Sequence, residues 1–223
     1  MGAVGGCGAS TLASAVALAL ARAGAGPTLV ELDLERGDLA GRYELPAERT
    51  LADLVPVLDE LTSAHVEQVV YRHESGVRLL LGRPDPDAAA PWTTDAVARL
   101  LDAAVPAGPL VVDVGNPGSA RSAAALERAT STLVAAPLTL AGARAAVRVI
   151  ARPGPAAPPA LVASPVPSGG ELSPRALGGA VRLPVAGVLP AAPGCAADLG
   201  GGRWPRRSRL ARRVETLVQE LVA

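Results

Sequence analysis

The sequence predicts an α/β fold in which a doubly wound, mainly parallel sheet has helices on both faces. Short runs rich in Val and Leu alternate with longer Ala-rich stretches along the 223 residues, which is typical of repeated βα units. Hydrophobic residues make up 49% of the chain and charged residues 19%, so the chain can bury a sizeable core. Turn residues lie at nearly every junction between the runs. We expect residues 1–223 to form one domain.

Six near-continuous apolar runs have the length and composition of strands that are covered on both faces. These runs are 28–32, 77–81, 110–114, 131–135, 160–163 and 185–189. Seven other stretches have the apolar spacing of helices. These stretches are 10–23, 51–59, 64–70, 94–104, 120–128, 141–151 and 207–222. The proline-rich stretch 152–159 predicts an extended connection, and the segments 153–170 and 190–205 predict long loops.

Composition excludes several classes of function. All 21 basic residues are Arg, so no mechanism can use a lysine, and the 21 acidic residues balance them, which argues against a field that steers the whole protein onto nucleic acid. Cys7 and Cys195 have no partner at ligand spacing, which excludes a metal knuckle and a CxxC pair and favours a reducing compartment. The apolar run 12–20 is too short to span a bilayer and follows no basic segment, so we expect a cytoplasmic protein.

A glycine-rich loop opens directly into the first predicted helix. Its residues are Gly5, Gly6, Cys7, Gly8, Ala9, Ser10 and Thr11. Glycines let successive backbone N–H groups curl around an oxyanion, which predicts a phosphate site. In a P-loop a lysine follows the last glycine and the next hydroxyl binds Mg²⁺, and those two positions are Ala9 and Ser10 here. The alternative interpretation is an ordinary turn before an Ala-rich helix.

Carboxylates follow two of the predicted strands. Glu31 and Asp33 lie at the end of the strand 28–32, and Asp113 lies at the end of the strand 110–114. Open α/β sheets bind their ligands at the carboxyl ends of their strands. An acid in the position of Asp113 can hold Mg²⁺ or its water opposite the loop hydroxyl. Each of these acidic positions alone is also consistent with a solvated strand end, but the loop, the acidic pair and Asp113 in this order predict a nucleotide site.

With these residues the chain resembles the MinD/ParA group of deviant P-loop ATPases, and most closely the CpaE/TadZ-like proteins of pilus assembly and the septum-site-determining-like proteins. Three further segments carry the resemblance, which covers nearly the whole chain: 31–39, 49–54 and 70–80. The resemblance implies a P-loop NTPase fold with ATP and Mg²⁺ as ligands. It implies that the residues from Gly5 to Thr11 bind phosphate, that Ser10 and Asp113 hold Mg²⁺, and that Asp33 positions a water.

The chain departs from this family at three positions. The signature lysine of the family falls on Val4, the ordinary P-loop lysine falls on Ala9, and the Asn that reads adenine falls near Ser164. Since both lysines are lost, we expect ATP hydrolysis to be weak or absent. The strand that precedes the loop in the family is missing before Met1, so we expect a chain truncated at its amino terminus.

The resemblance implies a function as well as a fold. It predicts an ATP-binding, homodimeric positioning protein that serves pilus or secretion machinery or the division site, through partners in those assemblies. The alternative is a pseudo-ATPase that binds no nucleotide and acts only as a protein-interaction module.

Six arginines crowd around the start of the last predicted helix, whose apolar residues repeat at helical spacing. They are Arg203, Arg206, Arg207, Arg209, Arg212 and Arg213. One interpretation is that the apolar face packs on the sheet and the arginines are solvated. The other is that they bind DNA without sequence preference, or the inner membrane surface from the cytoplasmic side. His65 and His73 lack triad partners, and we expect both to be surface residues of helices.

Overall fold

The computed structural model of the chain describes residues 1–82, 89–115, 117–151, 158–166 and 170–222. Most of the predicted connection 152–159 and parts of the predicted loop 153–170 lie outside the described residues.

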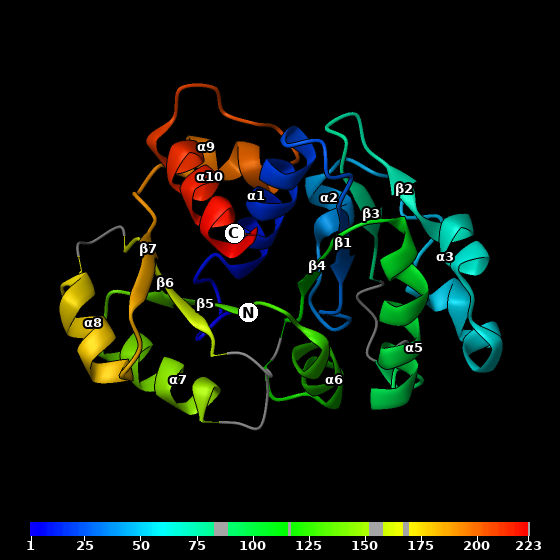
Figure 1. Ribbon diagram of the computed structural model, residues 1–223, viewed down its shortest axis with the longest axis horizontal. Coiled ribbons are helices and arrows are strands. Elements are labelled where there is room, and N and C mark those ends of the chain that lie inside the picture. Colours follow the sequence, from blue (N-terminus) through cyan, green and yellow to red (C-terminus); the bar gives the residue numbers. More distant parts are fainter. Residues whose placement is uncertain (83–88, 116, 152–157, 167–169, 223) are drawn as a thin grey trace.

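The strands form two sheets that lie side by side (Figure 1). In spatial order they are β2 (Tyr71–Arg72), β3 (Arg78–Leu80), β1 (Thr28–Glu31) and β4 (Leu110–Asp113), followed by β5 (Leu133–Pro137), β6 (Ala160–Ser164) and β7 (Val185–Val188). All the pairs are parallel except β2 with β3. The predicted mainly parallel sheet is confirmed, and every predicted strand is present. Only the short β2 was not predicted, and β5 begins two residues later than expected.

The first three residues lie between the two sheets. The amino group of Met1 donates a hydrogen bond to the carbonyl of Leu133 at 2.8 Å. The N–H of Ala135 donates to the carbonyl of Met1 at 2.9 Å, and the N–H of Ala3 donates to the carbonyl of Ala135 at 2.8 Å. This is the hydrogen-bond pattern of a parallel strand beside β5. No strand of the described residues pairs with both β4 and β5.

Helices cover both faces of the sheets (Figure 1). On one face lie α1 (Ala9–Arg22), α9 (Pro193–Gly200) and α10 (Arg209–Val222). On the other lie α3 (Ser63–Val69), α5 (Thr94–Ala104), α6 (Ala120–Arg128), α7 (Leu140–Ile150) and α8 (Pro174–Val181). Neighbouring strand residues point to opposite faces, so that Leu29 packs with α1 and Val30 packs with α5. Each strand therefore reads as a continuous apolar run because both of its faces are buried.

The structure corrects four predictions. The stretch predicted as a helix over 51–59 is a 3₁₀ segment, η1 (Leu51–Glu60), and its Pro56 has no N–H to bond. Helix α9 lies inside the predicted loop 190–205, where Gly and Pro hid the helical pattern. Helix α10 begins at Arg209 rather than 207, because Arg207 has a left-handed φ of 64°. His73 lies in the turn between β2 and β3, not on a helix.

Three short helical elements were not predicted. They are α2 (Leu39–Arg42), α8 and the 3₁₀ turn η2 (Val105–Ala107). For α8 the start signals were present, since the hydroxyl of Ser173 accepts from the N–H of Ala176 and Pro174 is the first helical residue. It lies between the two predicted loops 153–170 and 190–205, in a stretch for which the sequence analysis predicts no element.

Helix α10 packs against α1 through its apolar face. Leu210, Val214, Leu217 and Val218 are buried in the core that α1 lines, and Arg22 of α1 forms an ion pair with Glu215 at 3.7 Å. The arginines of the helix are exposed. The interpretation in which the apolar face packs on the core is therefore confirmed. Among the described residues, no helix has the combination of length and apolar character that crossing a bilayer requires.

Replacing Leu217 with alanine tests this packing. Leu217 is 2% exposed, and its loss should lower the free energy of unfolding by roughly 2–5 kcal/mol. The matched control Arg213→Ala removes an exposed side chain from the same helix and should change stability by no more than about 0.5 kcal/mol. Urea denaturation followed by circular dichroism measures both, and equal losses in the two variants would contradict the assigned face.

Candidate functional site

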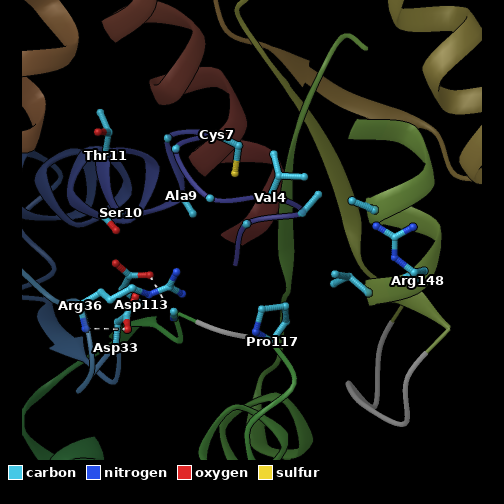
Figure 2. A pocket seen from close by; sticks show the side chains of 18 of the residues that line it. Val4, Cys7, Ala9, Ser10, Thr11, Asp33, Arg36, Asp113, Pro117 and Arg148 are labelled. Atoms are coloured by element: carbon cyan, nitrogen blue, oxygen red, sulfur yellow. Dashed lines mark hydrogen bonds between the residues drawn. The ribbon is translucent and has the colours of Figure 1, made fainter. Parts of the chain in front are cut away.

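A cavity of about 590 Å³ lies at the carboxyl ends of β1 and β4, between the start of α1 and helix α7 (Figure 2). Every site residue predicted from the sequence lines it: Gly5, Gly6, Cys7, Gly8, Ala9, Ser10, Thr11, Asp33 and Asp113. The structure therefore brings together the glycine loop and two acids, of which Asp113 lies more than a hundred residues after the loop in the sequence. Parallel strands end at the same edge of the sheet, which is why these residues meet.

The glycine loop presents backbone donors to this cavity. Gly6 and Gly8 have φ values of 74° and 86°, in the left-handed region that favours glycine. Gly8 caps α1 without any side-chain hydrogen bond, and the helical ladder begins where the N–H of Leu12 donates to the carbonyl of Gly8 at 2.8 Å. The N–H groups of the first turn thus have no partner within the helix. Together with the helix dipole, they form a site for an anion.

Ser10 faces the two acids across the cavity. Figure 2 shows its hydroxyl on the side of Asp113 and Asp33, while the side chain of Thr11 points away from them. The hydroxyl of Thr11 accepts a hydrogen bond from the guanidinium of Arg42 at 3.3 Å instead. Asp113 is only 3% exposed, and Asp33 is partly exposed. The two acids therefore occupy environments of different polarity within one cavity.

The oxygen ligands suit a hard cation that is shared with a phosphate. Among the described residues, no three His, Cys, Asp or Glu side chains are grouped to hold a metal ion by themselves. Ser10 offers a hydroxyl and Asp33 and Asp113 offer two carboxylates to the cavity. Mg²⁺ prefers such oxygen ligands and commonly completes its shell with substrate phosphates and waters. The residues present therefore fit Mg²⁺ bound together with a nucleotide.

Glu31 fixes the loop that bears Asp33. Its carboxylate is 2% exposed and accepts hydrogen bonds from the N–H of Leu39 at 2.9 Å and from the N–H of Gly82 at 3.0 Å. The carboxylate thereby ties the far end of the loop back to the end of β1. Burial raises the pKa of Glu31 from 4.5 to about 7, more than the two hydrogen bonds lower it. The sequence showed an acid here, but its positioning role depends on contacts that only the fold creates.

Two tight contacts hold Asp33 in place. Its side-chain oxygen accepts from the N–H of Arg36 at 3.2 Å, and its carbonyl accepts from the N–H of Gly37 at 2.7 Å. Gly115, just after β4, has a left-handed φ of 57°, and a Cβ there would overlap the side chain of Asp33. The segment that follows Asp113 therefore needs a glycine so that the two acids can share one cavity.

The cavity is also lined by three arginines that the sequence analysis did not assign to the site: Arg36, Arg42 and Arg148. The spacing of Asp38 and Arg42 by four residues could have indicated their ion pair, which measures 2.6 Å. No signal in the sequence places Arg148 at this cavity, because it belongs to α7, a helix that packs on the second sheet. Val4 and Ala9, where the resembled family has lysines, line the cavity as apolar residues.

A second cavity of about 200 Å³ adjoins the glycine loop. It is lined by Gly6 and Gly8, by the end of β6 with Ser164 and Pro165, and by mostly apolar residues between 189 and 214. Ser164 is 2% exposed, and its hydroxyl has no hydrogen-bond partner among the described residues. An unpaired buried hydroxyl in an apolar cavity is costly unless a ligand bonds it.

Comparison with solved structures identifies the fold. The chain is similar to the ParA family ATPase from Chlorobium tepidum TLS, with a TM-score of 0.85 and 17% identity over 100% of this chain and 96% of that one. It is also similar to the septum site-determining protein MinD from Pyrococcus horikoshii OT3 in complex with Mg-ADP, with a TM-score of 0.79 and 16% identity over 98% and 92% of the two chains. A complex of a Cyanothece McdA variant with ATP gives a TM-score of 0.70 and 15% identity over 98% and 93%.

No protein-family model and no curated protein sequence matches the chain. The structural likeness extends over essentially the full length of these chains. The chain therefore has the fold of the MinD/ParA-type P-loop ATPases, and the fold expected from the resemblance is confirmed.

The raised pKa of Glu31 makes stability depend on pH. Between pH 4.5 and about 7 the folded chain holds a proton that the unfolded chain has lost, so stability should fall as pH rises through this window. The loss should be on the order of 2 kcal/mol between about pH 5 and about pH 7.5.

Glu31→Gln should remove this slope. In the variant, the side-chain NH₂ group faces one of the two backbone N–H donors, which costs stability. That loss of stability does not change with pH. Other groups titrate in both proteins, so the difference between their pH profiles in urea denaturation isolates Glu31. A variant that keeps the full slope of the parent would show that Glu31 ionises freely.

Proposed function

We propose that the chain is an ATP-binding positioning protein of the MinD/ParA type, with weak or no ATP hydrolysis. Within that type we propose that it belongs with the CpaE-like proteins. We propose further that it acts as a homodimer in the cytoplasm, for pilus or secretion machinery or for the division site. The observation that supports this most directly is the glycine-loop cavity, whose backbone donors, hydroxyl and two acids are those that a magnesium nucleotide requires. MinD in complex with Mg-ADP and McdA in complex with ATP share this fold.

Each part of the cavity has a role in this proposal. The N–H groups of the loop and of the first turn of α1 bind phosphate oxygens, and Ser10 with Asp113 holds Mg²⁺. When bound, Mg²⁺ neutralises charge on the phosphates. Asp33 accepts a hydrogen bond from a water and orients it. The base occupies the adjoining apolar cavity, which Ser164 and Pro165 border.

Weak hydrolysis follows from the charges that the loop lacks. Val4 and Ala9 are apolar, and the chain contains no lysine. Charge that develops on transferred phosphate is normally stabilised by fixed cations, and each such group is worth several kcal/mol in the transition state. Binding depends more on the backbone donors, which are intact. The same apolar positions favour a second candidate function, a pseudo-ATPase that binds no nucleotide and serves as an interaction module.

Gly8→Val separates the two candidates. Gly8 has a left-handed φ of 86°, so a β-branched residue there would distort the loop and its Cβ would project into open space at the phosphate site. The variant should lose saturable binding of a fluorescent ATP analogue in the presence of Mg²⁺.

Gly24→Val is the matched control. Gly24 has a φ of 81° and no atom within 4 Å of its Cβ, but it lies at the other end of α1. Both variants carry a similar backbone strain, and only the first should lose binding. Absence of binding by the parent at about millimolar nucleotide would leave the interaction module as the function.

The exposed arginines around α10 support a further element of the proposal. Arg203 forms ion pairs with Asp198 and Glu44 at 3.4 and 3.6 Å. The other five, Arg206, Arg207, Arg209, Arg212 and Arg213, are exposed and have no acidic partner among the described residues. We name these five the arginine patch. A hollow of about 360 Å³ lies among Arg209, Arg212 and Arg213. We propose that the patch binds a polyanion, either DNA without sequence preference or the anionic inner membrane surface.

Changing Arg212 and Arg213 together to Gln should weaken this binding and reduce its dependence on salt. Binding releases counterions from each phosphate that an arginine contacts, so a variant with fewer contacts releases fewer counterions. The fold should persist, since Gln forms helices nearly as well as Arg. Binding to two unrelated DNA duplexes and to anionic vesicles is measured at several salt concentrations. Changing Arg144 and Arg175 to Gln on α7 and α8 removes the same charge elsewhere and should have little effect. If the parent binds neither ligand at low salt, the patch is only a solvated surface.

A further inference from the structure

The glycine-loop cavity holds two acids close to the place where a polyphosphate would lie. Asp33 and Asp113 face it, and the loop itself contains no cation. A nucleoside triphosphate adds several negative charges to the same space. Backbone N–H groups and one helix dipole offset only part of such a charge. A cationic side chain from outside the loop can offset the rest, and this chain, which has no lysine, offers arginines for that role.

Two of the three arginines that line the cavity lie on the acidic side of it, and one of them is paired with an acid. The guanidinium of Arg42 contacts Asp38 at 2.6 Å and Thr11 at 3.3 Å. Arg36 lies beside Asp33 and on the same side of the cavity as Asp113 (Figure 2). The ion pair with Asp38 offsets the charge of Arg42. The guanidinium of Arg36 makes no ion pair with a described residue, but it lies with the two carboxylates and away from the side of the loop where Val4 lies.

Arg148 differs from both. Figure 2 shows it across the cavity from Ser10 and the two acids, on the side of the loop where Val4 lies. It is exposed, and it makes no ion pair or hydrogen bond with any described residue. Its helix is fixed, because the neighbouring Ala146 and Val149 are buried in the core. A long cationic side chain on a rigid helix thus borders the cavity with no acid to neutralise it.

We propose that Arg148 binds the phosphate chain of the nucleotide and supplies the positive charge that the loop lacks. This inference rests on the proposed nucleotide binding and names the residue that completes it. Guanidinium groups bind phosphate oxygens through two parallel hydrogen bonds, so Arg suits this contact at least as well as Lys. The site then spans both sheets, with the loop and acids contributed by one and the cation by the other.

Arg148→Gln should weaken binding of Mg-ATP by roughly 10- to 100-fold, the range expected for loss of a charged hydrogen bond. Arg148→Lys should retain most of the affinity. Arg144→Gln is the matched control, because Arg144 is exposed one turn away on the same helix and does not line the cavity. Binding is measured by displacement of a fluorescent ATP analogue, with ATP, adenosine and inorganic tripolyphosphate as competitors.

The competitors locate the contact. If Arg148 binds phosphate, the Arg148→Gln variant should lose affinity for ATP and for tripolyphosphate. Its affinity for adenosine should equal that of the parent. Equal affinity of parent and variant for ATP, an equal loss in Arg144→Gln, or an equal loss for adenosine would each overturn the proposal and leave the proposed function intact. If the parent binds none of the competitors, the proposed function fails and the role of Arg148 with it. Unchanged urea denaturation would show that the losses do not come from unfolding.

Discussion

The parallel pairing of β1 with β4 is the constraint on which the site depends. Its register sets Glu31 opposite Asp113, and the ladder continues where the N–H of Leu32 donates to the carbonyl of Asp113 at 2.8 Å. This pairing ends both strands at the same edge of the sheet, so their acids must share one space. A slip of one residue would turn one of these acids toward the opposite face of the sheet. The sheet thus determines which acids face the glycine loop.

The acids at this edge of the sheet repel one another, and the fold reduces that repulsion differently for each of them. Glu31 is buried and bonded to two N–H groups, and desolvation together with the charges of Asp113 and Asp38 favours its protonated form. Asp33 remains partly exposed, and Arg42 neutralises Asp38. One acid therefore serves the structure, while others remain available for a cation or a water. The division of roles follows from burial rather than from residue type.

Sequence alone predicted the sheet well because strands buried on both faces are continuous apolar runs. It predicted the loop and the two acids because their order along the chain reflects the order of βα units. It did not reveal α8 and α9, whose Gly and Pro residues resemble a loop and whose stability comes from packing. It also could not place Arg148, because α7 reaches the cavity only after the two sheets come together. Contacts between distant elements leave no local pattern in a sequence.

The absence of lysine gives residues 1–223 an unusual chemical property. None of their side chains carries a primary amine. Reagents that couple to amines, such as succinimidyl esters and aldehyde fixatives, therefore find no side chain to modify in this segment. A lysine introduced in place of the exposed Arg144 on α7 would be the one side-chain amine of the segment, so its labelling would report on the surface of that helix alone.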